Sequence, residues 1–445
     1  MAAGPPGVVG ATLRPGEHGY DEARRVPIPG FEHRRPVAVV RCASADDVAA
    51  GLALARELGA PVAVRSGGHC FAGRSSTDGV VLDVGPMRDI ELEPDGLVRI
   101  GAGARLGDVY AALERHGLAL NAGCGPTVGI AGLTLGGGLG ILGRTYGLLS
   151  DRLRAAEVVL PDGGPRTVDA EHDAELFWGL RGAGGARFAV VTALVFEPVP
   201  APATTGFELA WAPEHAGRVL DAWQHWSPDA PEALAASCVL RARDGAGITL
   251  VRVFGAMAAP EADLRPELCT LAAAAGAPMR ERCRSGPFRG AKRFLNGVDE
   301  EGPPVQPVCA SEFLDRPLAP DDLRALVAHL AADAGVAGER ELDCSPWAGA
   351  YTRVATDATA FPHRAARVLV KHGAGVDPAA PAAEREAARA WVRRSRELAH
   401  PSGTGGAYVN FPDGDLDAWD AAYLGANRER LLALKHRCDP AGVLG

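Results

Sequence analysis

The sequence predicts an α+β fold of two domains, and three observations support this prediction. Short strand-like and helix-like segments alternate over the first 200 residues. Pro198, Pro200 and Pro202 then form a linker-like stretch, after which longer amphipathic helices alternate with apolar runs to about residue 400. With 445 residues, the chain is also long enough for roughly two to four domains of ordinary size.

The first elements carry clear start and stop signals. Ser44 can cap a helix that has acidic residues in its first turn and ends near Gly59. The apolar run 61–64 predicts a short buried strand that leads directly into the loop 65–69. The other segments expected in this half are strands at 80–84, 158–160 and 188–196, a hairpin at 90–93 and 97–100, and a helix at 106–116.

The second half contains longer elements. The patterns predict helices at 320–335, 379–398 and 419–437, a strand-like run at 347–354, and apolar runs at 248–254 and 367–371. No internal repeat is present. The tail is rich in aromatic residues, which is unusual for a loose terminus.

Composition excludes several classes of function. The 55 Asp and Glu residues exceed the 46 Lys and Arg residues, so the basic surface needed for nucleic acid or an anionic membrane is not expected. The sequence has no CxxC, HExxH or GxSxG motif, so we expect no metal site and no acyl transfer. The uncharged segment 121–143 is glycine-rich and is expected to be a loop region, not a membrane span. Without a signal-peptide pattern, we expect a soluble cytoplasmic protein.

Two glycine-rich loops are the strongest candidates for a ligand site. In the segment 65–69, two glycines after a strand allow backbone amides to approach an anion closely, with an arginine before them and a histidine after them. A second region, 129–138, contains five glycines and can bring backbone close to an extended ligand. A pyrophosphate held by the amides of both loops is the simplest explanation.

A third glycine pattern is less convincing. Gly138–Gly143 matches the GxGxxG dinucleotide fingerprint, but glycines and a proline precede it where a Rossmann turn requires a strand. A nicotinamide-dependent oxidoreductase therefore remains an alternative that the context disfavours.

Several segments carry a resemblance to a known family. Val64–Gly73 resembles the histidyl-flavin loop of the FAD-linked oxidases of the vanillyl-alcohol oxidase type. Gly123–Gly138 and Ala407–Asp413 are similar to the berberine bridge enzyme-like branch, and Phe177–Gly185 and Asp439-Pro440 also fit. The resemblance spans nearly the whole chain, although the middle third is only loosely similar. It implies a two-domain flavoprotein: 1–202 and the tail 403–445 would form a PCMH-type FAD-binding domain, and 203–402 a substrate domain with an antiparallel sheet.

The resemblance implies covalently bound FAD. His69 would bond to the flavin 8α carbon through a neutral ring nitrogen, and Cys124 would be a second attachment at flavin C6. Gly125 here separates Cys124 from Pro126, whereas the branch often has Cys directly before Pro-Thr-Val-Gly. A buried unreactive Cys124 therefore stays open as an alternative, and Cys70 is a weaker competitor for the attachment. Val128 would leave room for oxygen beside the flavin. The other residues implied to contact the cofactor are Arg65, Ser66, Gly67, Gly68, Gly129, Gly132, Gly137, Gly138, Val190 and Tyr408.

The resemblance also implies catalytic and substrate-binding residues. Tyr408 would be the general base that takes the substrate proton while hydride passes to the flavin, and Asn410 would orient substrate or tyrosinate. Both lie on one side if 407–413 is a strand. Because a free phenol has a pKa near 10, the base would need positive charge or hydrogen-bond donors nearby. The expected strand 347–354 would place Tyr351 and Arg353 on one face, where they could line the substrate pocket.

The function implied is therefore oxygen-dependent oxidation of a small molecule, with hydride transfer to FAD and release of hydrogen peroxide. We favour natural-product tailoring or oxidative cyclisation over a carbohydrate or alcohol oxidase. A catalytically inactive flavin-binding protein is the alternative from a different class. The sequence indicates neither the substrate nor the oligomeric state.

Overall fold

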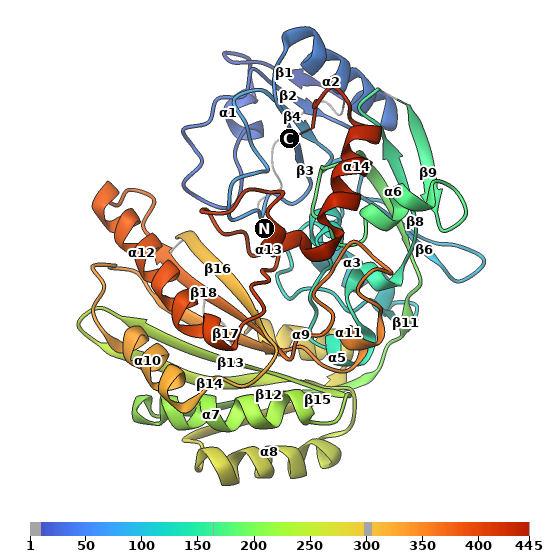
Figure 1. Ribbon diagram of the computed structural model, residues 1–445. Coiled ribbons are helices and arrows are strands. Elements are labelled where there is room, and N and C mark those ends of the chain that lie inside the picture. The colour runs from blue at the N-terminus through green and yellow to red at the C-terminus, as the bar shows by residue number, and fades with distance from the viewer. Residues whose placement is uncertain (1–9, 163, 298–304, 445) are drawn as a thin grey trace.

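The computed structural model describes residues 10–162, 164–297 and 305–444, and Figure 1 shows their arrangement. Two sheets belong to the N-terminal half. In the four-stranded sheet, β2, β4 and β3 run parallel and β1 pairs antiparallel at the edge. Their bounds are β1 Thr12–Leu13, β2 Ala38–Arg41, β3 Val62–Arg65 and β4 Val80–Asp83.

The second sheet of this half has five antiparallel strands in the order β5-β6-β10-β8-β9. The strands are β5 Ile90–Leu92, β6 Val98–Gly101, β8 Leu153–Val159, β9 Pro165–Asp169 and β10 Val190–Phe196. The predicted hairpin is the pair β5 and β6, so this prediction is confirmed. A short ladder joins β7 (Leu118–Ala119) to β11 (Val199–Pro200).

The helix α2 (Ala45–Leu58) confirms the predicted start and stop signals. Ser44 and Asp47 form a reciprocal capping box, and Gly59 ends the helix in the left-handed conformation. The other helices of this half are α1 Tyr20–Ala23, α3 Leu106–Glu114, α4 Ile130–Leu135, α5 Gly143–Tyr146 and α6 Ala174–Gly179. Loops therefore make up most of the uncharged segment 121–143, as expected.

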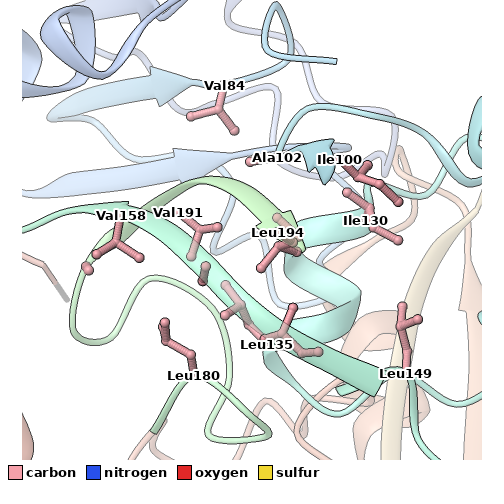
Figure 2. Close-up of a cluster of buried hydrophobic side chains, with 14 of the residues drawn as sticks. Val84, Ile100, Ala102, Ile130, Leu135, Leu149, Val158, Leu180, Val191 and Leu194 are labelled. Carbon is pink, nitrogen blue, oxygen red and sulfur yellow. The ribbon is translucent and has the colours of Figure 1, made fainter. Parts of the chain in front are cut away.

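One hydrophobic core fills the N-terminal half. Figure 2 shows part of it, where Val158 and Val191 come from neighbouring strands and Leu135 comes from α4. Residues of the C-terminal tail, such as Leu431 and Leu434, belong to the same core. Segments far apart in the sequence thus stabilise one body by burying apolar surface together.

The middle of the chain forms a seven-stranded antiparallel sheet in the order β15-β12-β14-β13-β17-β18-β16. The strands are β12 Ala203–Trp211, β13 Leu234–Arg243, β14 Gly247–Met257, β15 Arg280–Pro287, β16 Gln306–Leu314, β17 Arg340–Pro346 and β18 Val368–Val376. Four helices cover one face and bury a second core. They are α7 Ala216–Trp226, α8 Glu261–Ala275, α10 Pro320–Ala331 and α12 Ala382–Ala399, and α9 Phe288–Asn296 lies at the sheet's end.

The C-terminal tail returns to the N-terminal half, where α14 (Arg428–Cys438) packs against α6 and Leu444 bridges to Val62 of β3 (Figure 1). The single helix predicted at 419–437 is wrong. Gly425, at φ 51° and ψ −140°, separates α13 (Ala421–Leu424) from α14, and a three-residue 3₁₀ turn joins them.

The strand predicted at 347–354 is also wrong. Strand β17 ends at Pro346, and Gly349 then adopts φ 68°, which an extended strand does not allow. The short helix α11 (Ala350–Arg353) follows. Among the described residues, no helix combines the length and apolar character that crossing a bilayer would require.

Candidate active site

A cavity of about 930 Å³ lies between the N-terminal half and the uncovered face of the seven-stranded sheet. The two predicted glycine-rich loops, the sheet face and the segment 408–412 all contribute to its lining. Its size is at the upper end of the range for small-molecule and cofactor sites. Of the predicted site residues, the cavity is lined by Ser66, Gly67, Gly68, His69, Cys124, Val128, Gly129, Gly132, Tyr351, Tyr408 and Asn410.

The two glycine loops touch each other at Gly67 and Gly129. A Cβ at Gly67 would lie 2.2 Å from the Gly129 nitrogen, and a Cβ at Gly129 would lie 2.3 Å from the Gly67 nitrogen. Only glycine at both positions permits this approach. The Ser66 hydroxyl donates to the Ala102 carbonyl at 2.6 Å and fixes the start of the first loop. Backbone from both loops is thus available to one ligand.

Five predicted site residues do not line the cavity. The Arg65 guanidinium is buried elsewhere, 3.0 Å from Asp83 and donating to the Ala23 carbonyl, so it supports the loop and does not reach the cavity. Gly137, Gly138 and Val190 are also outside the lining, although Val191 and Ala189 are part of it. Arg353 is 57% exposed and pairs with Glu232, because α11 replaces the expected strand.

His69 has the properties of a neutral nucleophile. Its Nε2 atom lies 3.0 Å from the Thr127 hydroxyl, across the contact between the two loops. Burial and the nearby Arg105 lower the pKa of the His69 imidazole below its usual value. The ring is therefore neutral at pH 7, and one of its nitrogens has an available lone pair.

Cys124 lines the cavity despite the extra residue that follows it. Gly125 accepts a hydrogen bond from the Val128 amide at 3.2 Å, so a tight turn over 125–128 absorbs the additional length. Cys70 also lines the cavity. The insertion therefore does not remove the Cys124 side chain from the site.

Tyr408 and Asn410 come together through a turn, and 407–413 does not form a strand. The Phe411 amide donates to the Tyr408 carbonyl at 2.9 Å, which closes the turn. The Asn410 side-chain amide donates to the Tyr408 hydroxyl oxygen at 3.1 Å and to the Leu133 carbonyl at 3.0 Å. A Cβ at Gly136 would lie 2.1 Å from Asn410 Oδ1, so Asn410 needs a glycine there.

Three donors converge on the buried Tyr408 oxygen. Besides Asn410, the backbone amides of Gly138 and Leu139 donate to it at 3.1 and 3.2 Å. Burial raises the pKa of the Tyr408 phenol, and the three hydrogen bonds oppose that rise. Such donors stabilise negative charge on the oxygen. The requirement for nearby donors was predictable from the sequence, but the use of Gly138 and Leu139 was not.

Aromatic side chains form the wall behind Tyr408. Tyr351 stacks on Trp347 with ring centroids 4.2 Å apart, and Phe411 meets the Tyr408 ring edge-on at 5.1 Å. Tyr351 lines the cavity, as expected, but from a helix. A Cβ at Gly143 would lie 1.4 Å from the Tyr351 hydroxyl oxygen, so this glycine serves packing. The GxGxxG segment lies between α4 and the four-residue α5, which is not the strand–turn–helix setting of a dinucleotide fingerprint.

A polar row on the sheet face is the feature that sequence reasoning missed. Ser237, Asp343, Ser345 and Lys371 line the cavity from β13, β17 and β18. The two serine hydroxyls lie 3.1 Å apart, and Lys371 Nζ lies 2.8 Å from Glu341 and 3.8 Å from Asp343. The alternation of polar with apolar residues in Arg340–Pro346 was the available signal.

The residues present fit the FAD that the resemblance implies. The cavity has adequate volume, two loops expose backbone where a Cβ would collide, and a neutral imidazole and a thiol line the same space. These are the groups needed to bind a flavin dinucleotide and to bond to its ring.

Comparison with known families supports the same conclusion. Residues 36–169 match the family described as FAD binding domain, and residues 407–445 match the family described as berberine and berberine like. The two matched segments contain both glycine loops and Tyr408.

Similar proteins cover almost the whole chain. An uncharacterized FAD-linked oxidoreductase, YgaK of Bacillus subtilis, is 32% identical over 95% of this chain and 93% of its own length. Aclacinomycin-N/aclacinomycin-A oxidase of Streptomyces galilaeus is 31% identical over 93% of this chain and 85% of its own. The solved structure of a chitooligosaccharide oxidase superimposes with a TM-score of 0.84 at 25% identity, covering 97% of this chain and 95% of that one.

Proposed function

Because this chain belongs to the berberine bridge enzyme-like family of FAD-linked oxidoreductases, we propose that it is an oxygen-dependent oxidase of a small molecule. The proposal rests mainly on the environment of Tyr408. Its hydroxyl oxygen accepts three hydrogen bonds at the edge of the cofactor cavity. A phenol in an ordinary core position would not need three donors on one oxygen.

The proposed reaction removes a proton and a hydride from the substrate. Asn410 and the amides of Gly138 and Leu139 stabilise the phenolate form of Tyr408, which takes the proton and becomes a neutral phenol before the proton moves on. When bound, FAD accepts the hydride and passes two electrons to dioxygen. The two hydrogens lost by the substrate are balanced by those in hydrogen peroxide. Val128, which lines the cavity, is proposed to leave space for dioxygen.

We propose that His69 and Cys124 both bond to the flavin. The neutral nitrogen of His69 would attach to the 8α carbon in place of one hydrogen there, and the Cys124 sulfur, losing its own hydrogen, would attach to C6 in place of the hydrogen there. Each attachment would release protons to solvent, and dioxygen would accept the two electrons and be reduced to hydrogen peroxide. The exposed backbone of the two loops supports this arrangement by holding the cofactor between the two side chains.

Acid precipitation is expected to distinguish the two attachments. The wild-type protein, the His69→Ala variant and the Cys124→Ala variant should each retain yellow flavin in the pellet, and the double variant should release all of it. Absorbance of pellet and supernatant measures this directly. Release of all flavin from the wild type would contradict covalent attachment but not flavin binding. A Cys42→Ala variant, which removes a buried thiol outside the cavity, is the matched control.

We also propose that different segments of the chain bind the cofactor and the substrate. Residues 1–202 and 403–445 would hold FAD, and residues 203–402 would bind substrate. The two largest cores support this division, because one is formed mostly by the N-terminal half and the tail and the other lies under the seven-stranded sheet.

For the substrate, we propose a natural-product scaffold that undergoes a tailoring oxidation or oxidative cyclisation. The aromatic side chains of Tyr351 and Phe411, which line the cavity, support an apolar ring system. The polar row in the same cavity favours a second candidate, a carbohydrate or alcohol oxidase, because Asp343 and Lys371 could bind hydroxyl groups.

Reoxidation by dioxygen tests the oxidase proposal without knowledge of the substrate. Protein reduced with dithionite under nitrogen is mixed with oxygenated buffer while flavin absorbance is recorded. We expect recovery of the oxidised spectrum within seconds, with one hydrogen peroxide formed per flavin. Recovery over many minutes would contradict the oxidase assignment and indicate a dehydrogenase or an inactive flavin-binding protein.

A further inference from the structure

Lysine is rare in this chain and is kept away from the surface. Only three of the 46 Lys and Arg residues are lysines: Lys292, Lys371 and Lys435. Lys371 and Lys435 form ion pairs with Glu341 and Asp439. Lys292, which is 2% exposed, forms no ion pair with any carboxylate among the residues that the structure describes.

The ammonium of Lys292 is held by neutral groups. It donates to the carbonyl of Gly123 at 3.0 Å and to the carbonyl of Ala122. The rings of Tyr110 and Phe288 lie with their centroids 4.6 and 5.3 Å from Nζ. The Tyr110 hydroxyl also donates to the Gly123 carbonyl at 2.5 Å. The hydrogen bonds from Lys292 and Tyr110 fix the two residues that directly precede Cys124.

This arrangement favours a negative charge close by. Among the residues described, Lys292 has exchanged its hydration for neutral partners and has no carboxylate counter-ion, so an anion in its neighbourhood is stabilised. Burial lowers the pKa of Lys292 to about 8, which leaves it mostly protonated at pH 7, and the Cys124 thiol is the acidic group that acts on it. The thiolate of Cys124 is the form that this cation stabilises, and the thiolate is the nucleophile.

We propose that Lys292 is a positioning residue for flavin attachment at Cys124. It fixes the loop 122–124 from the neighbouring helix α9 and favours the thiolate that bonds to flavin C6. The inference rests on the attachment at Cys124 proposed above, with dioxygen as the oxidant of that step. A contact between the middle segment and the N-terminal half would thus assist the covalent attachment of the cofactor.

Each attachment is tested in the variant that lacks the other. Lys292→Met is combined with His69→Ala, where only Cys124 can hold flavin, and separately with Cys124→Ala, where only His69 can. Each protein is incubated with FAD in air, and flavin retained in the acid pellet is measured over time. We expect Lys292→Met to slow retention on the order of tenfold in the first background and to leave it unchanged in the second. Arg293→Met, an exposed neighbour on the same helix, is the matched control.

The outcomes separate this inference from the proposed function. Equal retention with and without Lys292→Met in the His69→Ala background would overturn the role of Lys292. An equal loss in both backgrounds would overturn it too, since that indicates general misfolding. If His69→Ala alone retained no flavin, the attachment at Cys124 would fail and the inference with it. Mass spectrometry of the peptide containing Cys124 identifies the bonded sulfur directly.

Discussion

Replacing Tyr408 by phenylalanine is expected to lower kcat on the order of 10²- to 10⁴-fold, with KM changed little. The substitution keeps the ring that packs against Phe411 but removes the oxygen on which three donors converge. Because the proton has no acceptor in the variant, hydride transfer from the substrate is slowed. Anaerobic stopped-flow reduction of the bound flavin by substrate measures this step separately from reoxidation.

The same residue predicts the pH dependence of the wild-type enzyme. Burial holds the pKa of the Tyr408 phenol above its ordinary value of 10, so the active phenolate is a minor form at neutral pH. Its fraction grows as pH rises, and kcat/KM should therefore increase toward alkaline pH until that pKa is passed. Asn410→Ala removes one hydrogen-bond donor to the phenolate, so we expect the rise in kcat/KM to occur at higher pH in this variant.

Two controls make the result decisive. Tyr146→Phe removes a hydroxyl that does not line the cavity, and its flavin reduction should match the wild type. Reoxidation of Tyr408→Phe by dioxygen should also be unchanged, since that step does not use the phenol. A kcat for Tyr408→Phe within threefold of wild type, with the alkaline rise intact, would remove Tyr408 from the role of base.

Sequence patterns predicted the helix ends and turns correctly where the structure depends on residues close together in the chain. The capping box at Ser44, the stop at Gly59 and the hairpin around Pro94-Asp-Gly96 are set by residues within a few positions of each other. The glycines of the two loops were identified as points of close backbone approach, and Gly67 and Gly129 are such points. Their roles toward FAD remain predictions.

Features that depend on long-range packing escaped sequence reasoning. Tyr408 and Asn410 share a side because a turn joins them and Gly136 leaves room for the amide, not because a strand alternates. Lys292 directly precedes the exposed Arg293, and only the packing of α9 onto the loop before Cys124 distinguishes it from another solvated charge. The role of Lys292 depends on this tertiary contact, which no local sequence pattern indicates.

Three buried cations join the middle of the chain to the N-terminal half. Arg144 donates to four carbonyls between Pro228 and Leu234, and Lys292 binds the loop before Cys124. The third, Arg364, forms two hydrogen bonds to Asp151 at 2.9 and 2.7 Å and one to the Thr359 hydroxyl at 2.8 Å. Each cation replaces lost hydration with several oxygen acceptors, so each stabilises the boundary that shapes the cavity.

Arg364→Met is expected to destabilise the protein by about 3–5 kcal/mol, because it leaves the Asp151 carboxylate largely buried without its partner. Urea unfolding followed by tryptophan fluorescence measures the loss. The exposed pair of Arg367 and Asp229 gives the matched control, since Arg367→Met should cost less than about 1 kcal/mol. The double variant Arg364→Met with Asp151→Asn should recover part of the stability, because the unpaired charge is removed. Equal destabilisation by Arg364→Met and Arg367→Met would show that the buried pair does not hold the two parts of the molecule together.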